Sequence, residues 1–518
     1  MSYIRSYDKQ YIHGQWIHST RKQNNEDDDD SSTLNVIDSN TSNIIATIPN
    51  GTKQDTIKAI TAANTALPKW RATPLKIRLN YIRTFLEKIE CHREEINNRL
   101  IVELGCTKTF ANDAQLGSLI GHTITLLNLL DTDNENGNNG NGGDESKFQW
   151  EYAAGKCTVV KEPIGVVGCI TPWNYPLNQI ALKVIPALLA GCTVVLKPSE
   201  ITPLCAYSVC EAFHDSELPK GVFNMVMGKG PECGEILASH ENVNLVSFTG
   251  STSAGQILTK VAAESGTMKP IKTELGGKSA SLLLHDANFD KVVPVYVKQL
   301  TSNTGQSCNA LSRMIVPRSS YQKVVELCIQ TMKTEIIGDS RYNSKATIGP
   351  LVSQKQYESV ISLITSGIQD DGATLLYGGL EKPSTILESK ENKNGYFVQP
   401  TLFGDVTNKM IIARTEIFGP VLCLIPYDTV EEGIEIANDT PYGLNNAVAS
   451  NDIKKAVQVA AQLQSGMVMV NHTNLDLKAP FGGYKLSGNA REWGESGLDE
   501  FLITKMINMD INEYRKNK

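Results

Sequence analysis

The chain of 518 residues is too long for one compact core, so we expect about two or three domains. Hydrophobic residues make up 41% and charged residues 20% of the sequence, which is typical of a globular protein with large cores. The net charge of −7 is spread thinly, without a run of lysine and arginine, so nucleic acid is not expected as a partner.

Local composition excludes three further classes of protein. Residues 1–12 lack the apolar core of a secretory signal. The longest apolar stretch, residues 180–196, contains Lys183, Pro186 and Gly191, whereas a membrane span needs about 20 nearly unbroken apolar residues. The 11 cysteines show no Cys-x-x-Cys pair and no Cys/His ligand spacing, so a metal site is not expected. We therefore expect a cytoplasmic protein with reduced thiols and no membrane contact.

Two segments of low complexity interrupt the chain. Residues 24–32 carry an acidic run, and residues 131–146 are rich in Asn, Gly and acidic side chains. Neither segment can bury apolar surface, so both are predicted to be solvated loops or disordered inserts without chemistry.

The predicted elements change in character at about residue 157. Before it, residues 56–63 and 77–102 show helical spacing. After it, short apolar strands alternate with helices, with strands at 158–160, 164–170, 193–196, 222–226 and 245–248 and helices at 177–189, 206–213, 233–239 and 253–263. This alternation predicts a parallel, doubly wound sheet of the nucleotide-binding kind. A second α/β region is predicted from about residue 280 to residue 471, and a separate tail after residue 485.

Two strand ends carry residues suited to a dinucleotide. Lys197 and Glu200 follow the strand at 193–196, where a charged residue can hold ribose hydroxyls. Gly250 and Ser251 follow the strand at 245–248 and begin a helix, where small residues let backbone N–H groups approach a pyrophosphate. The usual dinucleotide fingerprint is absent, and Lys272 stands where a kinase-type or ATPase-type phosphate loop requires glycine.

A candidate nucleophile, Cys308, lies in a small and polar segment at residues 303–310, unlike Cys169, Cys192 and Cys423 with their apolar neighbours. A thiolate is an excellent nucleophile near neutral pH if its surroundings lower its pKa. Taken alone, this segment fits an inert buried thiol better than a nucleophile.

Three other segments supply matching chemistry. Glu274 precedes a pair of glycines, which permit close approach of backbone or substrate. Asn174 lies in a turn between aromatic residues and is suited to donate to an oxyanion. Glu416 and Phe418 offer a carboxylate and a ring that could hold a flat cofactor ring and its ribose. The glycine-rich segment 481–488 completes the series.

In order and spacing, these motifs resemble those of the aldehyde dehydrogenase superfamily, from about Ile12 to Asn508 apart from the two acidic segments. The resemblance implies an α/β fold class, with a Rossmann-like cofactor domain, a second α/β catalytic domain and a small β arm for oligomerisation. The predicted bounds are 1–130 and 160–274 for the NAD(P)-binding domain, 275–478 for the catalytic domain, and 131–159 with 479–518 for the arm and C-terminal tail. The arm implies a homodimer or homotetramer.

The resemblance also implies residue roles. Cys308 matches the family's nucleophile, Glu274 its general base, and Asn174 its oxyanion donor, together with the backbone N–H of Cys308. The implied cofactor contacts are Trp173, Lys197, Glu200, Gly230, Gly250, Ser251, Gly276, Glu416 and Phe418. Thr304 departs from the family, in which alanine is common at this position.

The implied reaction oxidises a small-molecule aldehyde to a carboxylic acid with NAD, or with NADP, through a thioester on Cys308 that a water activated by Glu274 hydrolyses. Two alternatives stay open. Relatives that transfer the acyl group to coenzyme A usually lack the carboxylate that Glu274 supplies, and a non-catalytic structural relative would lack Cys308 or Glu274. The sequence does not predict which aldehyde is oxidised, and no arginine cluster indicates a carboxylate-bearing semialdehyde.

Overall fold

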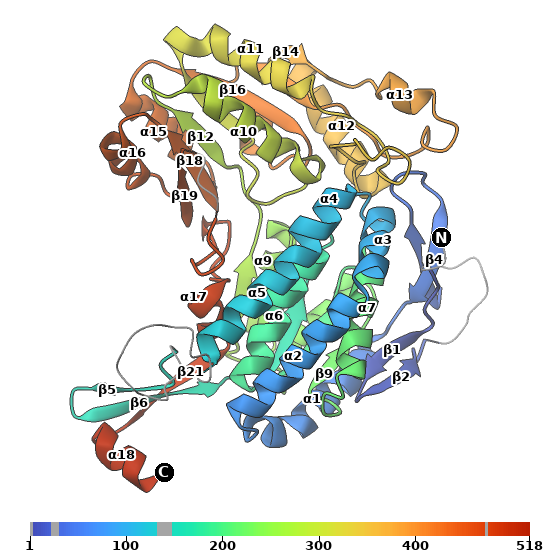
Figure 1. Ribbon diagram of the computed structural model, residues 1–518, viewed down its shortest axis with the longest axis vertical. Helices are drawn as coiled ribbons and strands as arrows, with labels where there is room; N and C mark the ends of the chain where they lie inside the picture. Colours follow the sequence, from blue (N-terminus) through green and yellow to red (C-terminus); the bar gives the residue numbers. More distant parts are fainter. Residues whose placement is uncertain (1–3, 22–30, 132–147, 472–474) are drawn as a thin grey trace.

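The computed structural model describes residues 4–21, 31–131, 148–471 and 475–518. Almost all of the two low-complexity segments predicted at 24–32 and 131–146 lies outside these residues. The described chain forms two seven-stranded sheets, each flanked by helices, and a three-stranded arm (Figure 1). The predicted α/β fold class is confirmed.

The first sheet has the order β11-β10-β7-β8-β9-β1-β2. Strands β11, β10, β7, β8 and β9 are parallel to one another. Strands β1 and β2 add an antiparallel edge. Their bounds are β1 (Lys9–Ile12), β2 (Gln15–His18), β7 (Val166–Ile170), β8 (Thr193–Lys197), β9 (Phe223–Met225), β10 (Leu245–Thr249) and β11 (Ile271–Glu274).

Helices cover both faces of this sheet. On β7, Val166 and Ile170 pack into one apolar cluster, whereas Val167 and Cys169 pack into the other. A strand buried on both faces reads as a continuous apolar run, which is why it was predictable. One cluster includes residues of α1 (Lys53–Arg71), α8 (Glu235–Ser239) and α9 (Thr252–Glu264), and the other includes residues of α2 (Leu75–Cys91), α3 (Arg93–Glu103), α5 (Gly117–Leu130), α6 (Pro176–Ala190) and α7 (Leu204–Asp215).

The helix predicted over 77–102 is two helices, α2 and α3, that meet at His92. The backbone of His92, with φ −105° and ψ 14°, leaves the helical region there. Apolar residues continue at helical spacing on both sides of the break, so the sequence pattern did not reveal it.

The second sheet has the order β14-β15-β16-β13-β12-β18-β19, and only β14 pairs antiparallel among these strands. Helices α10 (Phe289–Thr301) and α11 (Tyr321–Met332) pack into one cluster, and α12 (Gln354–Gln369), α14 (Ile411–Arg414), α15 (Val430–Asn438) and α16 (Ile453–Ala460) into another. The strands are β12 (Ala280–Leu283), β13 (Arg313–Pro317), β14 (Thr374–Tyr377), β15 (Thr401–Gly404), β16 (Val421–Tyr427), β18 (Asn445–Ala449) and β19 (Met467–Val470).

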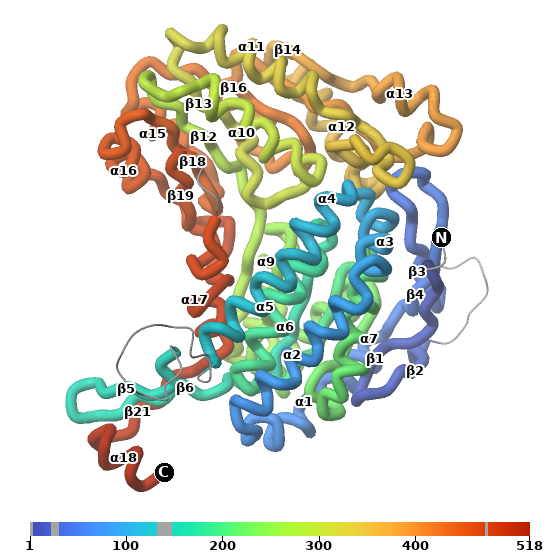
Figure 2. The backbone as a smooth tube through the Cα atoms, viewed as in Figure 1, coloured from blue at the N-terminus to red at the C-terminus, as the bar shows by residue number. Residues whose placement is uncertain are grey.

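The arm projects away from both sheets (Figure 2). It consists of β5 (Glu151–Ala154), β6 (Cys157–Pro163) and β21 (Leu502–Ile507), with β6 in the middle and both pairings antiparallel. Before β21, the chain packs against the first sheet, because Gly488 bridges to Glu274 and α17 (Gly494–Asp499) contributes Leu498 to its core. A short helix, α18 (Ile511–Asn517), follows the arm.

The remaining short elements connect these layers. They include the hairpin β3 (Thr33–Ile37) and β4 (Ile44–Pro49), the pair β17 (Tyr442–Gly443) and β20 (Tyr484–Lys485), the helices α4 (Lys108–Phe110) and α13 (Ser384–Leu387), and a π-helical turn at Ala111–Leu116. Among the described residues, no helix combines the length and apolar character that crossing a membrane requires.

Candidate active site

A cavity of about 250 Å³ lies beyond the carboxyl ends of β7, β10 and β11. Parallel α/β sheets bind ligands at this end of their strands. All the predicted site residues except Lys197, Glu200 and Gly230 line the cavity, namely Trp173, Asn174, Gly250, Ser251, Glu274, Gly276, Cys308, Glu416 and Phe418. The structure therefore brings together residues that lie far apart in the sequence.

The loop that carries Cys308 begins with an unusual backbone. Asn303 and Thr304 have φ angles of 50° and 57°, a left-handed conformation that is uncommon for residues with a side chain and rare for a β-branched one. Gly305 also has a positive φ, and a Cβ atom there would lie 2.2 Å from the backbone carbon of Gly419. The segment Ser302–Gly305 thus packs closely against the backbone at Gly419.

Hydrogen bonds hold this loop in place. The hydroxyl of Thr304 donates to the carbonyl of Gly349 at 3.0 Å. The side chain of Gln306 donates to the carbonyl of Asn303 at 2.9 Å and accepts from the backbone N–H of Val352 at 2.9 Å. Left-handed residues persist where the surrounding structure over-determines them, and these bonds fix the approach to Cys308.

Asn174 is anchored beside the same loop. Its backbone carbonyl accepts from the side chains of Gln115 at 2.9 Å and Asn303 at 3.1 Å. Its Nδ2 donates to the carbonyl of Gln306 at 3.0 Å. A side-chain amide has two N–H groups, so the second can serve a group bound at Cys308.

Glu274 and Cys308 are two weakly acidic groups that line the same cavity. Glu274 is 1% exposed, and neither carboxyl oxygen has a hydrogen-bond partner among the described residues. Burial, together with the charge of Glu492, raises the pKa of Glu274 to about 8. Burial also raises the pKa of the Cys308 thiol well above its ordinary value, and Glu274 adds to that shift. Both shifts favour the protonated forms of the two groups.

A buried ion pair was missed by the sequence analysis. Lys183 on α6 is 1% exposed and forms an ion pair with Glu492. It also donates to Thr249 at 2.7 Å and to Gln179 at 3.2 Å. Lys183 had appeared only as an interruption of an apolar stretch, but a lysine in a fully buried helix needs a partner. That signal was available, although the sequence did not show which residue supplies the partner.

Glu416 enters the cavity next to a glycine that leaves room for it. A Cβ atom at Gly276 would lie 2.1 Å from a carboxyl oxygen of Glu416. The other oxygen accepts from the backbone N–H of Gly277 at 2.9 Å. Burial raises the pKa of Glu416 to about 7. The rings of Phe418 and Trp173 meet edge to face, with centroids 5.3 Å apart, so one carboxylate and two rings share this wall.

The three predicted residues that do not line the cavity lie nearby in the fold. Lys197 ends β8 and forms an ion pair with Glu200 at 2.8 Å. The side chain of Lys197 is buried, whereas that of Glu200 is 35% exposed. Gly230 lies in the turn before α8, and a Cβ atom there would meet open space. Glycine is therefore not sterically required at position 230.

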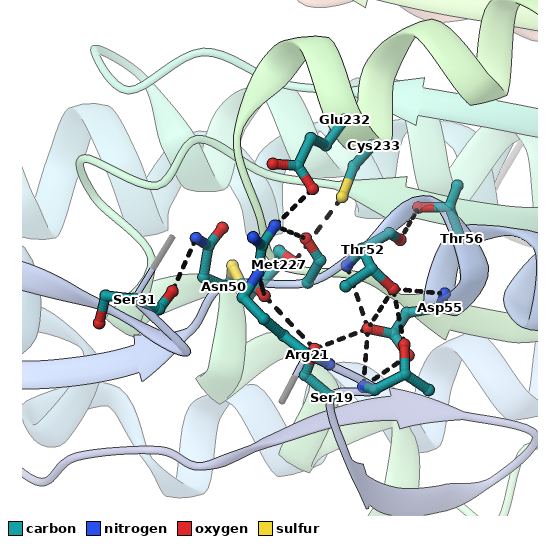
Figure 3. A network of polar contacts seen from close by, with 12 residues as sticks. Ser19, Arg21, Ser31, Asn50, Thr52, Asp55, Thr56, Met227, Glu232 and Cys233 are labelled. Carbon is teal, nitrogen blue, oxygen red and sulfur yellow. Dashed lines mark hydrogen bonds and ion pairs between the residues drawn. The ribbon is translucent and has the colours of Figure 1, made fainter. Parts of the chain in front are cut away.

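A polar network fixes the chain around this turn (Figure 3). Arg21 pairs with Glu232, which follows Gly230 in the turn. Beside it, the carboxylate of Asp55 accepts from the hydroxyl of Ser19 at 2.7 Å and from the backbone N–H of Thr52 at 3.0 Å. Burial alone would raise the pKa of Asp55, but these hydrogen bonds lower it. The network ties the N-terminal strands to the start of α1.

No group of three or more His, Cys, Asp or Glu side chains in the described part of the chain is arranged to hold a metal ion. The site therefore offers a thiol, carboxyl groups, an amide and aromatic rings around one cavity. That combination is suited to nucleophilic chemistry on a carbonyl group.

The chain belongs to the aldehyde dehydrogenase family, whose sequence profile matches residues 26–507. Members of this family are oxidoreductases that oxidise aldehydes, and this activity is the function of the chain in its broad form. The resemblance inferred from the motifs is confirmed.

Individual relatives agree over nearly the whole length. The chain is 42% identical to a 3-succinoylsemialdehyde-pyridine dehydrogenase of Pseudomonas sp, covering 97% of this chain and 99% of the relative. Aldehyde dehydrogenase C of Pseudomonas syringae, solved as a mutant with NAD+ and octanal, is 38% identical with a TM-score of 0.88, covering 96% of both chains. Betaine aldehyde dehydrogenase of Staphylococcus aureus, solved with NAD+, is 33% identical with a TM-score of 0.87, covering 96% of this chain and 94% of that one.

Proposed function

We propose that the protein oxidises an aldehyde to a carboxylic acid with NAD+, through a thioester on Cys308 that water hydrolyses with Glu274 as general base. The observation that carries the proposal is the meeting of Cys308, Glu274 and Asn174 in one cavity that Glu416 and Phe418 also line.

The residues present fit a dinucleotide. Gly250 and Ser251 precede the N-terminus of α9, where backbone N–H groups attract phosphate. Gly276 leaves space for Glu416, whose carboxylate is suited to ribose hydroxyls, and Phe418 and Trp173 offer faces for a planar ring. NAD+ supplies a hydride acceptor when it is bound, and two solved relatives contain it.

In the first half-reaction, Cys308 loses its proton and its sulfur attacks the carbonyl carbon. The negative charge that develops on oxygen is stabilised by the Nδ2 group of Asn174 and the backbone N–H of Cys308. Removal of one such donor typically costs about 10²–10³ in rate. The anchoring of Asn174 through Gln115 and Asn303 supports this role, because a fixed donor needs no reorganisation during the reaction.

In the second half-reaction, Glu274 takes a proton from water as the water attacks the thioester. Its unpartnered oxygens leave it available to do so, and a general base is worth roughly 10²–10⁴ in rate. A carboxyl group in this position favours hydrolysis over transfer of the acyl group to coenzyme A.

The test compares two variants with a control. Cys308→Ala should abolish NADH formation while NAD+ still binds, as measured by calorimetry. Glu274→Gln should produce a single burst of NADH and an acyl-enzyme detectable by mass spectrometry, followed by slow turnover without coenzyme A. Cys91→Ala, at an exposed cysteine outside the site, should keep full activity. Near-normal turnover in Cys308→Ala would refute the mechanism.

The arm supports a proposal that the chain forms a homo-oligomer. Strand β21 lies at one edge of the arm, and it leaves Ile503 45% and Met506 64% exposed. Exposed apolar side chains on an open strand edge are suited to pairing with another chain. Light scattering should give a dimer or tetramer, and a monomer at micromolar concentration would refute this assignment.

A further inference from the structure

Gln179 is a polar residue of the active-site cavity to which the proposed function gives no role. It lies in the first half of α6 and lines the same cavity as Glu274 and Cys308. Its side chain is buried, with only 5% of the residue exposed. Buried polar side chains in native proteins nearly always have hydrogen-bond partners, so each polar atom of Gln179 calls for one.

Lys183 fixes the orientation of this side-chain amide. Its Nζ donates to Oε1 of Gln179 at 3.2 Å. An ammonium group can donate but cannot accept, so the oxygen of the amide must face Lys183 and Nε2 must face away from it. Nε2 has no hydrogen-bond partner among the described residues. Its N–H groups are therefore left to donate within the cavity.

The same ammonium group links Gln179 to the neighbourhood of the general base. Lys183 also donates to the hydroxyl of Thr249 at 2.7 Å, and Thr249 on β10 is the strand partner of Glu274 on β11. Burial raises the pKa of Glu274, and the charge of Lys183 opposes that shift, as expected for groups that lie close together. These contacts place the amide of Gln179 near the carboxyl group of Glu274.

A donor and an acceptor that both lack partners and line one cavity fit a bound water molecule. The carboxyl oxygens of Glu274 have no partner in the described part of the chain, but a carboxyl group alone does not hold a water in one orientation, since a bound water typically makes about three hydrogen bonds. Three side-chain amides line the cavity, those of Asn174, Gln179 and Gln356. Asn174 is assigned to the oxyanion, and Gln356 donates to the carbonyl of Phe418 at 2.9 Å. Gln179 supplies the remaining amide donor.

We propose that Gln179 positions the water that hydrolyses the thioester, by donating a hydrogen bond from Nε2 to the water oxygen while Glu274 takes one proton of the water. The water oxygen then forms a bond to the thioester carbon, and the C–S bond breaks. The carboxylic acid is released, and the sulfur of Cys308 leaves as a thiolate. The inference rests on the proposed function, because it assumes that a thioester forms on Cys308.

The experiment separates formation of the acyl-enzyme from its hydrolysis. 4-Nitrophenyl acetate, which acylates reactive thiols without NAD+, is used to load an acetyl group on Cys308, and mass spectrometry follows the decay of the acetyl-enzyme. In Gln179→Met we expect acylation at the wild-type rate and hydrolysis slower by about 3–10-fold, as for the loss of one hydrogen bond. Methionine is a good helix former of similar length, so this variant should fold. Hydroxylamine, which attacks thioesters without a general base, should release the acetyl group equally fast from both proteins.

The matched control is Asn178→Leu, which removes the neighbouring amide on α6. Asn178 does not line the cavity, and its Oδ1 has no partner among the described residues. Wild-type hydrolysis in this variant, together with slow hydrolysis in Gln179→Met, supports the inference. Unchanged hydrolysis in Gln179→Met, equal slowing in Asn178→Leu, or equal slowing of the hydroxylamine reaction overturns it. A wild-type protein that never carries an acyl group on Cys308 would instead overturn the proposed function.

Discussion

Replacement of Thr304 by valine tests how the nucleophile loop is held. Thr304 is 3% exposed, has a φ of 57°, and donates its hydroxyl to the carbonyl of Gly349 at 3.0 Å. Valine keeps the branched shape but cannot donate, so the buried carbonyl loses this donor at a cost of about 1–3 kcal/mol. The left-handed backbone costs about 1–2 kcal/mol per residue, and this bond helps to hold it. We therefore expect Thr304→Val to destabilise the fold by about 1–3 kcal/mol.

The loop should also relax, and a displacement of about 1 Å can cost as much as 10² in rate. We expect kcat to fall in Thr304→Val while the KM for NAD+ changes little, because Gly250, Ser251 and Glu416 lie outside the loop. The assays are urea unfolding, steady-state kinetics and the rate of Cys308 alkylation. Thr304→Ser keeps the hydroxyl and should restore most of the loss. Wild-type stability and kcat in the valine variant, or an equal loss in the serine variant, would refute this account.

Three further predictions concern charged side chains in and around the active site. Since the pKa of Glu274 is raised to about 8 and a general base must be unprotonated, kcat should rise with pH through about 8. Glu492→Gln removes a charge that raises the pKa of Glu274, so the increase in kcat should occur at lower pH. An unchanged pH profile would contradict an electrostatic effect of Glu492 on Glu274. Lys183→Met leaves Glu492 buried without its ion-pair partner, so it should lower the free energy of unfolding, measured by chemical denaturation, by about 3–5 kcal/mol. Adding Glu492→Gln should restore part of that stability. Equal stability of the wild type and both variants would disprove a stabilising role of the pair. The wild type should prefer NAD+ over NADP+ in kcat/KM, because a 2′-phosphate near Glu200 would cost on the order of 1–4 kcal/mol. Glu200→Gln should narrow that gap, and a wild-type preference for NADP+ would show that Lys197 dominates there.

The sequence predicted elements where a single local pattern decides the structure. Strand β7 is a continuous apolar run because both of its faces are buried, and the turn that follows it holds Trp173 and Asn174. The pairing of Lys183 with Glu492 could not be predicted, because 309 residues separate them and only the packing of the tail against α6 joins them. A separate cavity of about 350 Å³ could not be predicted either, because its walls come from residues near 110, 303 and 347.

The raised pKa values of Cys308 and Glu274 impose an order on the proposed reaction. Burial raises both pKa values, so the thiol must lose its proton to an acceptor within the cavity. Glu274 lines that cavity, and its carboxyl oxygens have no partner in the described part of the chain, so it is suited to take this proton. Once protonated, however, it cannot accept a second proton from water. Hydrolysis of the thioester must therefore wait until Glu274 has released the proton of Cys308, and a pKa of about 8 allows that release at mildly alkaline pH.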